Sequence, residues 1–405
     1  MPLKILLSAF ACRPGLGSEP SVGWEVALQA ARRHDVWVLT DGINRFAVDG
    51  QVEGEAKSRI RFEYVSLPRI VRLLHAAPFF HQIYYIIWQV AAFFHARRIH
   101  SEVGFDLVHH VTYVNSWIPT FLGRLPGGVP LVWSAGGRER TRWPFYRYMS
   151  LRATSWEVLR DVSMALLGPL TTWITARRSK VILTSSNPSR WATGLPLRSF
   201  ALGGLSIPEL RACRKPKERH PGPFRVISVG RLLGLKGFEL SLRAFAHLRV
   251  DYPDAEYTIV GEGPEAARLR RVATELGCKD SVRFSGWLSR EEVLSAIYQA
   301  DVLVHPGLHE SFCFVLLEAM ASGKPVATLN IGGPAILADT EAAFRIPMDS
   351  PEAVIRHLTE AMLSLAENPE SATARGENLS AHAERHWTWE HVGDRLLRIY
   401  DEALS

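Results

Sequence analysis

Residues 301–330 read DVLVHPGLHESFCFVLLEAMASGKPVATLN. The stretch begins and ends with short apolar runs, 301–306 and 325–330, whose length and composition predict buried strands. Between them, residues 307–311 predict a loop and residues 316–321 predict a helix. A strand, a helix and a second strand in this order form the repeating unit of proteins with parallel sheets. We therefore expect an α/β fold.

The same pattern recurs along the whole chain. Most of the apolar runs are continuous rather than alternating, which is typical of parallel strands covered on both faces. Segments of helical period, such as 238–251 and 291–300, lie between most of them. Repeated units of this kind imply open parallel sheets with helices on both faces. The expected strands are KILLSAF (4–10), VWVLT (36–40), IRFEYV (60–65), DLVHHV (106–111), PLVWS (130–134), KVILTSS (180–186), FRVISVG (224–230), YTIVGEG (257–263), VRFSGW (282–287), DVLVHP (301–306) and PVATLN (325–330).

The series of strands restarts after residues 187–222, which hold several glycines and prolines, a basic run and no clear strand. A chain of 405 residues is long enough for two domains that each bury a core. Two Rossmann-like domains with a cleft between them are the simplest assembly, and ligands of such sheets bind outside the carboxyl ends of the strands. The expected division is an N-terminal Rossmann-like domain (1–200), a linker (201–222), a C-terminal Rossmann-like domain (223–385) and a final helix that packs back on the N-terminal domain (386–405).

The composition is that of an ordinary globular protein, with 47% hydrophobic and 22% charged residues. The net charge is only +6, but basic residues cluster in RERTRWPFYR (138–147) and ACRKPKERH (212–220). Such clusters suit phosphate groups or an anionic membrane surface. No recognisable nucleic-acid motif accompanies them, so we expect no nucleic-acid partner.

Four scattered cysteines, Cys12, Cys213, Cys278 and Cys313, have neither metal-ligand spacing nor the spacing of a disulfide framework, so we expect a reducing cytosol. The N-terminal apolar run predicts a first strand rather than a signal peptide, because a glycine-rich turn follows at once. The longest apolar stretch, 79–94, is short for a membrane-spanning helix, so we expect none.

The second half of the chain opens with SVGRLLGLKGFEL (228–240). The predicted strand ends at Gly230, Arg231 and Lys236 follow on a loop, and a helix begins near Phe238. Two cations and loop amides at the start of a helix could bind a diphosphate. The glycine pattern is neither that of a P-loop nor that of a dinucleotide fingerprint. A basic surface loop is the alternative interpretation.

Two glutamates, Glu310 and Glu318, flank the start of the helix in the opening stretch. Free amides near Phe312–Val315 could face an anion, Glu318 could accept hydrogen bonds from a diol such as a ribose, and Glu310 could meet a sugar hydroxyl. The structural alternative is that Ser311 caps the helix, that Glu310 favours its positive end, and that Glu318 is an ordinary helix residue. For Glu310 alone this alternative is favoured. The two glutamates together with the two cations of the preceding motif favour binding.

GRLLGLKG (230–237), the Glu310/Glu318 pair and EAMASGKPV (318–326) together resemble the retaining, nucleotide-sugar-dependent glycosyltransferases of family 4, which have the GT-B fold. The resemblance covers nearly the whole chain, and its C-terminal motifs are the specific part. The segment ACRPGLGSEPSVGW (11–24) resembles bacterial exopolysaccharide and lipopolysaccharide members. The resemblance implies a retaining, metal-independent hexosyltransferase of surface polysaccharide biosynthesis, with the donor in the C-terminal domain and the acceptor in the N-terminal domain.

The resemblance also implies roles for individual residues. Arg231 and Lys236 would bind the donor diphosphate and offset charge on the departing nucleotide. Glu310 would face the donor sugar, and Glu318 would hold the ribose. The other donor-binding residues that it implies are Gly15, Gly17, Gly230, Trp287, Leu288, Ser311, Phe312, Cys313, Phe314 and Val315.

A histidine after the DLVHHV strand often lies beside the sugar in this family. His109 and His110 are both candidates here, and the familiar His-x-His spacing would place the second histidine at Val111. A lone histidine at a strand end is more often structural. On the acceptor side, the expected residues are Glu19 and Arg138.

The family reaction needs no metal-binding Asp-x-Asp motif, and the sequence contains none. Positive charge and helix amides would then stabilise the leaving group. We expect no metal and no cofactor, with a UDP- or GDP-sugar as the co-substrate. The expected mechanism is a front-face displacement in which the donor phosphate takes the acceptor proton, since no pair of carboxylates is arranged as in a two-carboxylate hydrolase.

Two aromatic segments, 78–98 and 140–156, have the composition of amphipathic helices at a membrane interface, and core helices are the alternative. An interfacial position would make the acceptor a polyprenyl-diphosphate-linked sugar rather than a free saccharide. The expected location is the cytoplasm, with peripheral contact at the inner face of the plasma membrane as an option.

Two other functions stay open. A GT-B-fold sugar-nucleotide epimerase or hydrolase would need a further acid/base set, for which His109, His110 and Glu19 are the candidates. A non-catalytic nucleotide-sugar-binding protein is the second, because relatives commonly carry glycine at the position of Cys313. A side chain there could crowd the diphosphate or pack sideways.

Overall fold

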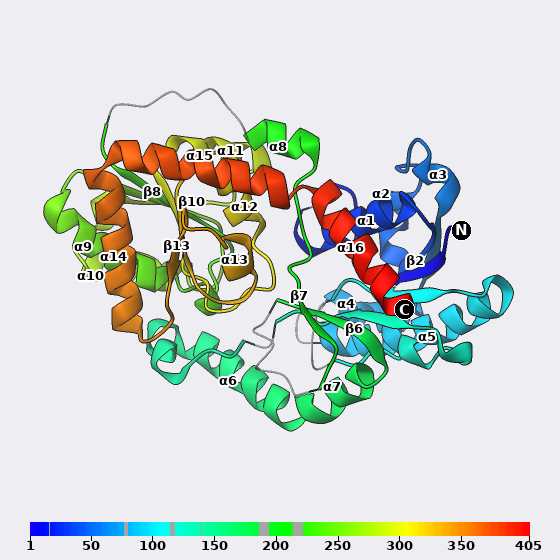
Figure 1. Cartoon of the computed structure of the whole chain (residues 1–405). Coiled ribbons are helices and arrows are strands. Elements are labelled where there is room, and N and C mark those ends of the chain that lie inside the picture. Colours follow the sequence, from blue (N-terminus) through cyan, green and yellow to red (C-terminus); the bar gives the residue numbers. More distant parts are fainter. Residues whose placement is uncertain (16, 77–79, 114–117, 138, 186–193, 214–221) are drawn as a thin grey trace. The chain divides into compact units, whose positions relative to one another are not determined.

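The computed structural model describes residues 1–15, 17–76, 80–113, 118–137, 139–185, 194–213 and 222–405. The chain folds into two compact units, shown in Figure 1. Unit 1 consists of Met1–Arg138, Met164–Gly203 and Trp389–Ser405, and unit 2 consists of Glu139–Ser163 and Gly204–Thr388. The chain therefore changes unit more often than the expected division into 1–200, a linker and 223–385 allows.

Unit 1 is built on a parallel sheet that has seven strands in the described part of the chain. Its order is β3-β2-β1-β4-β5-β6-β7, with β1 in the middle beside β2 and β4. The central strands are almost wholly buried, as their continuous apolar sequences predict. The strands are β1 (Lys4–Ser8), β2 (Asp35–Asp41), β3 (Ile60–Val65), β4 (Leu107–His110), β5 (Leu131–Ser134), β6 (Ser179–Thr184) and β7 (Leu197–Ser199).

Helices cover both faces of this sheet. The long helix α5 packs on one face through Tyr84, Trp88 and Ala92, in a core that also includes Ala176 of α7. On the other face, α16 packs against α1, and Arg32 forms an ion pair with Asp394 at 3.0 Å. The expected C-terminal helix is thus α16, a part of unit 1. The helices of unit 1 are α1 (Ser18–Ala31), α2 (Arg45–Val48), α3 (Ala56–Arg59), α4 (Arg69–Ala76), α5 (His81–Val103), α7 (Gly168–Ala176), α16 (Trp389–Leu404), and the 3₁₀ turns η1 (Gly42–Asn44), η2 (Leu122–Arg124) and η3 (Pro126–Gly128).

Unit 2 contains a second parallel sheet, with six strands in the order β10-β9-β8-β11-β12-β13 among the residues described. All the strands expected from the sequence are present in the two sheets. The short strands β7 and β13 were missed, since each is only three residues long and lies at a sheet edge. The strands of unit 2 are β8 (Arg225–Val229), β9 (Glu256–Val260), β10 (Val282–Gly286), β11 (Val302–His305), β12 (Val326–Leu329) and β13 (Phe344–Ile346).

The helices of unit 2 begin at clear local signals. Ser289 caps α11 in a reciprocal pair with Glu292, and Ser350 caps α14 ahead of Pro351. The buried side chains of α9, α10 and α14 form one apolar cluster with those of the sheet. α12 packs against α8, α11 and α15. These helices are α8 (Ile207–Cys213), α9 (Phe238–Asp251), α10 (Ala266–Glu275), α11 (Arg290–Gln299), α12 (Phe314–Ala321), α13 (Gly332–Leu337), α14 (Pro351–Glu367) and α15 (Pro369–His386), with the 3₁₀ turns η6 (Gly234–Lys236) and η7 (Lys279–Ser281).

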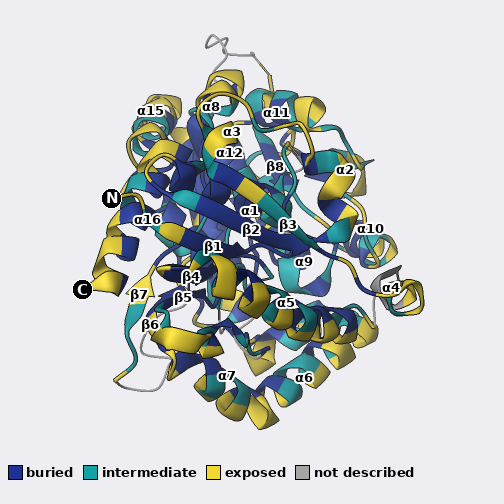
Figure 2. Ribbon diagram, turned by 90° about the vertical axis from the view of Figure 1, so that its right-hand side faces the viewer, coloured by how far each residue is buried: buried dark blue, intermediate teal, exposed yellow. Residues whose placement is uncertain are grey.

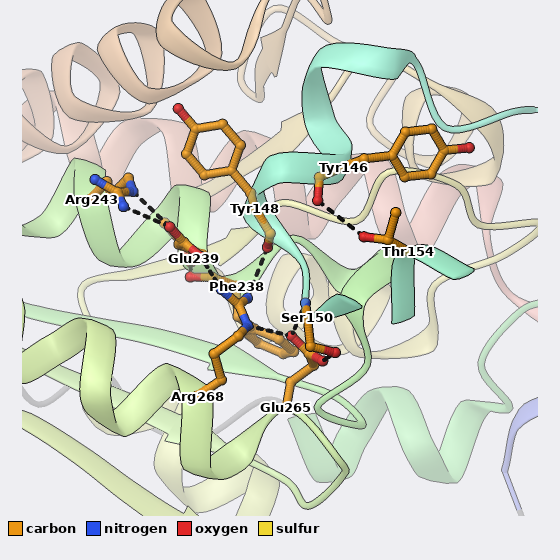
Figure 3. A network of polar contacts seen from close by, with 10 residues as sticks. Tyr146, Tyr148, Ser150, Thr154, Phe238, Glu239, Arg243, Glu265 and Arg268 are labelled. Carbon is orange, nitrogen blue, oxygen red and sulfur yellow. Dashed lines mark hydrogen bonds and ion pairs between the residues drawn. The ribbon is translucent and has the colours of Figure 1, made fainter. Parts of the chain in front are cut away.

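Residues 139–163 belong to unit 2 although the expected division placed them in the N-terminal domain. We call this segment the strap; it contains the 3₁₀ helix η4 (Trp143–Tyr148) and residues 151–163 of α6 (Leu151–Leu166). Figure 3 shows its attachment to α9 and α10. Arg268 donates to the carbonyl of Tyr148 at 2.8 Å, and the Ser150 amide donates to Glu265 at 3.2 Å. The strap is therefore fixed to unit 2 by buried, paired charges.

The helices expected to lie at a membrane interface are only partly buried. α5 buries one side in the core of unit 1 and exposes a second apolar side that includes Ile83 and Phe94. Figure 2 shows exposed residues along α5, α6 and α7. Among the described residues, none of the helices is both long and apolar enough to cross a bilayer.

Candidate functional site

Loops gather at the carboxyl edge of the unit 2 sheet, where β8, β11 and β12 end. Two glycines allow their backbones to touch. A Cβ on Gly237 (φ +65°) would lie 2.2 Å from the carbonyl oxygen of Pro306, and a Cβ on Gly332 (φ +60°) would lie 2.4 Å from that of Glu310. The loops that carry GRLLGLKG and HPGLHESF are therefore in direct contact.

Lys236 and Glu310 form an ion pair at this contact. Lys236 ends the turn η6, and its ammonium donates a hydrogen bond to the Glu310 carboxylate. His305, the last residue of β11, lies with Nε2 3.4 Å from Oε1 of Glu310. Burial raises the pKa of Glu310, but the hydrogen bond from His305 and the charge of Lys236 outweigh it and lower that pKa to about 2. Glu310 is therefore a charged carboxylate whose negative charge is balanced by Lys236 and His305.

Arg231, the other cation of the motif, is exposed. Its side chain has no hydrogen bond or ion pair with the described residues, in contrast to Lys236. The neighbouring Gly230 ends the strand region with a φ of +154°, and its amide donates to the carbonyl of Val260 at 2.9 Å. Of the two predicted diphosphate cations, the structure brings only Lys236 into contact with Glu310.

Cys313 is the N-cap of α12 and has extended backbone angles, φ −136° and ψ 92°. Its side chain is buried, with Sγ 3.7 Å from Nδ1 and 3.6 Å from Nε2 of His305. Burial lowers the pKa of His305, but the sulfur of Cys313 and the carboxylate of Glu310 outweigh it and raise that pKa to about 9. Cys313 thus packs sideways onto His305.

The helix α12 begins at Phe314, within the region 312–315 in which free amides were expected. The alternative that Ser311 caps this helix is wrong, because Cys313 occupies the cap position and makes no side-chain capping bond. The amides of Phe314 and Val315 stand in the first turn, where intrahelical acceptors are missing. The ring of Phe312 lies edge-on to that of Phe314, with centroids 4.6 Å apart.

Glu318 stands in the second turn of α12, which starts at Phe314. Its carboxylate is buried and lies 3.1 Å from Nη2 of Arg290, which in turn pairs with Glu209 of α8 at 2.5 Å. Burial raises the pKa of Glu318 to about 7, and the Arg290 pair offsets only part of this effect. The predicted ribose ligand is therefore already paired with Arg290.

The turn after β10 carries the residues predicted to contact a base. Trp287 is 73% exposed, and its amide lies 3.4 Å from Oε1 of Glu262. Leu288 is half-buried beside it. An exposed indole with a backbone turn next to it leaves a surface on which a flat ring could stack.

In unit 1, the predicted N-terminal loop leads into α1. Gly15 and Gly17 have φ values of +67° and +66°, and Gly17 is the N-cap of α1. Glu19 stands in the first turn of α1; burial, and to a lesser extent the charge of Glu19, raises the pKa of Tyr113. The acceptor residue predicted at Arg138 lies outside the described residues.

His109 and His110 point to opposite faces of the unit 1 sheet, as successive residues of a strand must. His109 is fully buried, with Nδ1 2.8 Å from the Tyr400 hydroxyl and Nε2 2.9 Å from Oγ of Ser134. Burial lowers its pKa to about 3. His109 therefore links α16 to the sheet, with Nδ1 at Tyr400 of α16 and Nε2 at Ser134 of β5, and its catalytic role stays a prediction.

His110 differs from its neighbour. Its Nε2 lies 3.3 Å from the hydroxyl of Tyr85 on α5, and its buried Nδ1 has no hydrogen-bond partner among the described residues. Burial lowers its pKa to about 4, so the ring is neutral. Of the two predicted histidines, only His110 keeps a nitrogen for another group.

Three further residues of the site, His305, Arg290 and His309, were not predicted from the sequence. His305 could have been found from the rule already applied to other loops, because it ends a strand at the carboxyl edge of the sheet. Arg290 and His309 carry no local signal, since their roles come from partners distant in the chain. Within the described ranges, no cluster of three or more His, Cys, Asp or Glu residues could hold a metal ion.

Comparisons with known proteins show a family match over part of the chain. Residues 211–379 match the family of glycosyl transferases group 1. Over 180 residues the chain is 34% identical to the D-inositol 3-phosphate glycosyltransferase of Corynebacterium urealyticum, covering 42% of this chain and 41% of that protein. The match spans well under two thirds of the length of such curated relatives.

Solved structures resemble the chain over almost its full length. One is WaaG, a glycosyltransferase involved in lipopolysaccharide biosynthesis, with a TM-score of 0.61, 18% identity, and coverage of 98% of this chain and 99% of that one. Another is Anabaena Alr3699/HepE in complex with UDP and glucose, with a TM-score of 0.58, 16% identity and coverage of 98% and 99%. The predicted fold class, GT-B with two Rossmann-like parallel-sheet halves, is confirmed.

Proposed function

We propose that this protein transfers a sugar from a nucleoside diphosphate sugar to a saccharide or lipid-linked saccharide acceptor, because residues 211–379 match the glycosyl transferases group 1 family and the chain has the GT-B fold. The observation that carries the proposal is the Lys236–Glu310 pair at the carboxyl edge of the unit 2 sheet. It joins the two sequence motifs at the place where parallel sheets bind ligands.

The donor diphosphate would lie at Lys236 and at the first amides of α12. An ammonium and a helix start both favour an anion, and neither requires a metal ion to do so. Arg231 is exposed, and its guanidinium would bind the phosphates on their solvent side. Glu318 would hold the ribose and share its carboxylate with Arg290. We expect a UDP- or GDP-sugar.

Glu310 would orient the donor sugar rather than attack it. Its low pKa and its two cationic neighbours make it a weak nucleophile, while a charged carboxylate accepts hydrogen bonds from sugar hydroxyls well. We therefore propose a front-face displacement with retention, as the resemblance to retaining family 4 enzymes implies. The anomeric carbon–phosphate bond breaks, the acceptor oxygen bonds to that carbon on the same face, and the donor phosphate takes the acceptor proton.

The acceptor would bind unit 1, where Glu19 and His110 belong to the same end of the sheet. An acceptor linked to a lipid would require contact with a membrane. The outer sides of α5 and α7 support this, because they combine exposed apolar residues with exposed Arg97, Arg98 and Arg177. Apolar insertion together with arginines suits an anionic lipid surface. The apolar residues are Ile83, Ile86, Ile87, Val90 and Phe94 of α5 and Leu170 and Trp173 of α7.

A reducing compartment suits the chain, because all four cysteines are free and buried. We therefore propose a cytoplasmic enzyme of surface polysaccharide biosynthesis that works at the inner face of the plasma membrane. Co-sedimentation with vesicles tests the membrane part. Vesicles containing phosphatidylglycerol should retain the protein, and pure phosphatidylcholine should retain much less. Equal recovery in the supernatant from both would contradict the proposed contact.

The donor proposal is tested by thermal unfolding with UDP, GDP and ADP. At least one should raise the melting temperature, since a ligand that binds the folded state stabilises it. If none does, the proposed function is wrong. Turnover with a panel of donors and lipid-extract acceptors then identifies the sugar, and NMR of the product reports whether the anomeric configuration is retained.

A further inference from the structure

The two faces of the strap's helix differ in an unusual way. Along α6, large apolar side chains are exposed to solvent, among them Leu151, Leu159 and Val162, with exposed fractions of 88%, 55% and 48%. The side turned to unit 2 carries Glu157 and Arg160, whose side chains are only 4% and 21% exposed. A helix that buries charges usually does so because those charges have a specific partner.

That partner is His309, in the loop between β11 and α12. Glu157 Oε2 lies 3.0 Å from Nε2 of His309, and Nη1 of Arg160 lies 2.6 Å from Nε2 and 3.1 Å from Nδ1 of the same ring. Arg160 also pairs with Glu157 at 3.1 Å, and Thr141 donates to Glu157 at 3.4 Å. The imidazole is thus contacted from the strap at both ring nitrogens.

The chemistry of the three groups is complementary. A carboxylate only accepts, so Nε2 of His309 carries the hydrogen that it donates to Glu157, and the guanidinium of Arg160 pairs with the same carboxylate at 3.1 Å. Burial raises the pKa of Glu157, but the hydrogen bond from His309 and the charges of His309 and Arg160 outweigh it and lower the pKa. Glu157 is therefore charged, and it fixes the orientation of the His309 ring.

Ala153 in the first turn of α6, and Met149 just before this helix, contact the loop that carries GRLLGLKG. A Cβ built on Gly234, inside GRLLGLKG, would lie 2.8 Å from Cβ of Ala153 and 3.1 Å from Cγ of Met149. The strap therefore packs against the loop that ends in Lys236 and binds the loop that carries Glu310, one residue after His309. Its own position is fixed by the buried pairs of Arg268 with Glu239 and Glu265.

From these contacts we infer that Glu157 and Arg160 are positioning residues of the donor site, which act through His309 on Glu310 and its pair with Lys236. The inference rests on the proposed function and extends it to a segment outside the group 1 domain. Neither residue needs to touch the donor. Each holds a loop that does, and a loop carrying a reacting group must be fixed within fractions of an ångström to be effective.

The test measures binding of UDP and of uridine to the full-length chain, or of GDP and guanosine if the wild type prefers GDP. Arg160→Ala and Glu157→Ala should each lower the affinity for the nucleoside diphosphate about tenfold and leave the affinity for the nucleoside within about twofold. The reason is that Lys236 and Glu310 lie where the diphosphate and the sugar would bind. Glu157→Gln keeps an acceptor for Nε2 and should restore most of the affinity. If the alanine variants instead disturbed the fold, the affinities for both ligands would fall, and Glu157→Gln would not restore them.

Two further variants separate positioning from general loosening of the strap. Arg147→Gln removes an exposed ion pair between the strap and Glu352, far along the chain from His309, and should leave both affinities unchanged. Gly234→Ala adds a methyl group against Ala153 without changing charge. It should lower the affinity for the nucleoside diphosphate as Arg160→Ala does.

The outcomes are distinguishable. If the wild type binds no nucleoside diphosphate, the proposed function is wrong and the inference falls with it. If the wild type binds one and the alanine variants of Glu157 and Arg160 bind it equally well, only the inference is wrong. It is also wrong if Arg147→Gln weakens the diphosphate as much as Arg160→Ala, since the effect would then be unspecific.

Discussion

The ammonium of Lys236 donates a hydrogen bond to the carboxylate of Glu310, 74 positions further along the chain. The pair is mostly buried, with side-chain exposed fractions of 18% and 13%. It connects the ends of two neighbouring strands, β8 and β11, whose register is parallel. Each charge therefore needs the other, both for the fold and for the proposed donor site.

Lys236→Ala should lower both stability and nucleotide affinity. Removing one partner of a buried pair leaves the other uncompensated, at a cost of about 3 kcal/mol in the free energy of unfolding. Affinity for UDP or GDP should fall at least about tenfold through the lost phosphate contact. Urea denaturation and calorimetric titration check the two effects. Arg356→Ala, which removes an exposed pair with Glu360, is the control and should change neither by much.

Glu318→Ala should weaken nucleotide binding through the ribose. The loss should be about tenfold for UDP and clearly smaller for 2′-deoxy-UDP, because the deoxy ligand lacks one of the hydroxyls that the carboxylate would accept from. Arg290→Gln removes the competing partner and should change the ratio of the two affinities as well. If the ratio of the affinities for UDP and 2′-deoxy-UDP were unchanged in both variants, Glu318 would not be a ribose-binding residue.

Stability should fall as pH rises from about 4.5 to about 7 because of Glu318. Its pKa is raised from 4.5 to about 7, so in this window the folded protein still holds a proton that the unfolded chain has released. Folding is then favoured at the acid end, and the free energy of unfolding declines with pH by at most about 3 kcal/mol. Urea unfolding at several pH values checks this. Glu318→Gln should flatten the slope, and parallel curves for the two proteins would show that another group titrates.

Cys313→Ala should leave nucleotide affinity within about twofold, because the sulfur packs against His305 rather than facing a ligand. The same variant should lower the pKa of His305 from about 9, since the sulfur is the largest influence that raises it. NMR titration of the imidazole resonances measures that shift. A large gain in UDP affinity would instead mean that the side chain crowds the diphosphate.

Tyr400→Phe should destabilise the protein and spare its activity. The lost hydroxyl leaves Nδ1 of His109 unsatisfied in the core, which costs about 1–3 kcal/mol. Tyr64→Phe removes a hydroxyl bonded to Asp49 at a more exposed position and should cost less. Thermal unfolding and donor turnover distinguish the roles: a loss of turnover at temperatures where Tyr400→Phe is folded would argue for a catalytic His109.

The regular elements of the fold followed from the sequence because their signals are local. Continuous apolar runs predicted the long strands, and α9 begins and ends where its period predicts, at Phe238 and Asp251. β7 and β13 carry no such signal, since three residues at a sheet edge gain their pairing from a neighbouring strand. Whether so short an edge strand forms depends on the neighbouring strand with which it pairs.

The candidate site was predictable to the extent that motifs sit on loops at strand ends. Lys236 and Glu310 were both identified from sequence, and the structure joins them. His109 and His110 are adjacent and equivalent in sequence, so only the helices on each face of the sheet give them different surroundings.

By itself, the sequence determined two parallel sheets of alternating strands and helices, and the loops from which a donor site could be built, because hydrophobic period and turn residues act over short distances. Tertiary structure alone decided that Glu318 pairs with Arg290 and that Cys313 packs on His305. It also decided that residues 139–163 join unit 2 and hold His309. Each of these contacts joins residues of different elements, which become neighbours only in the folded chain, where an unpaired buried polar group is costly.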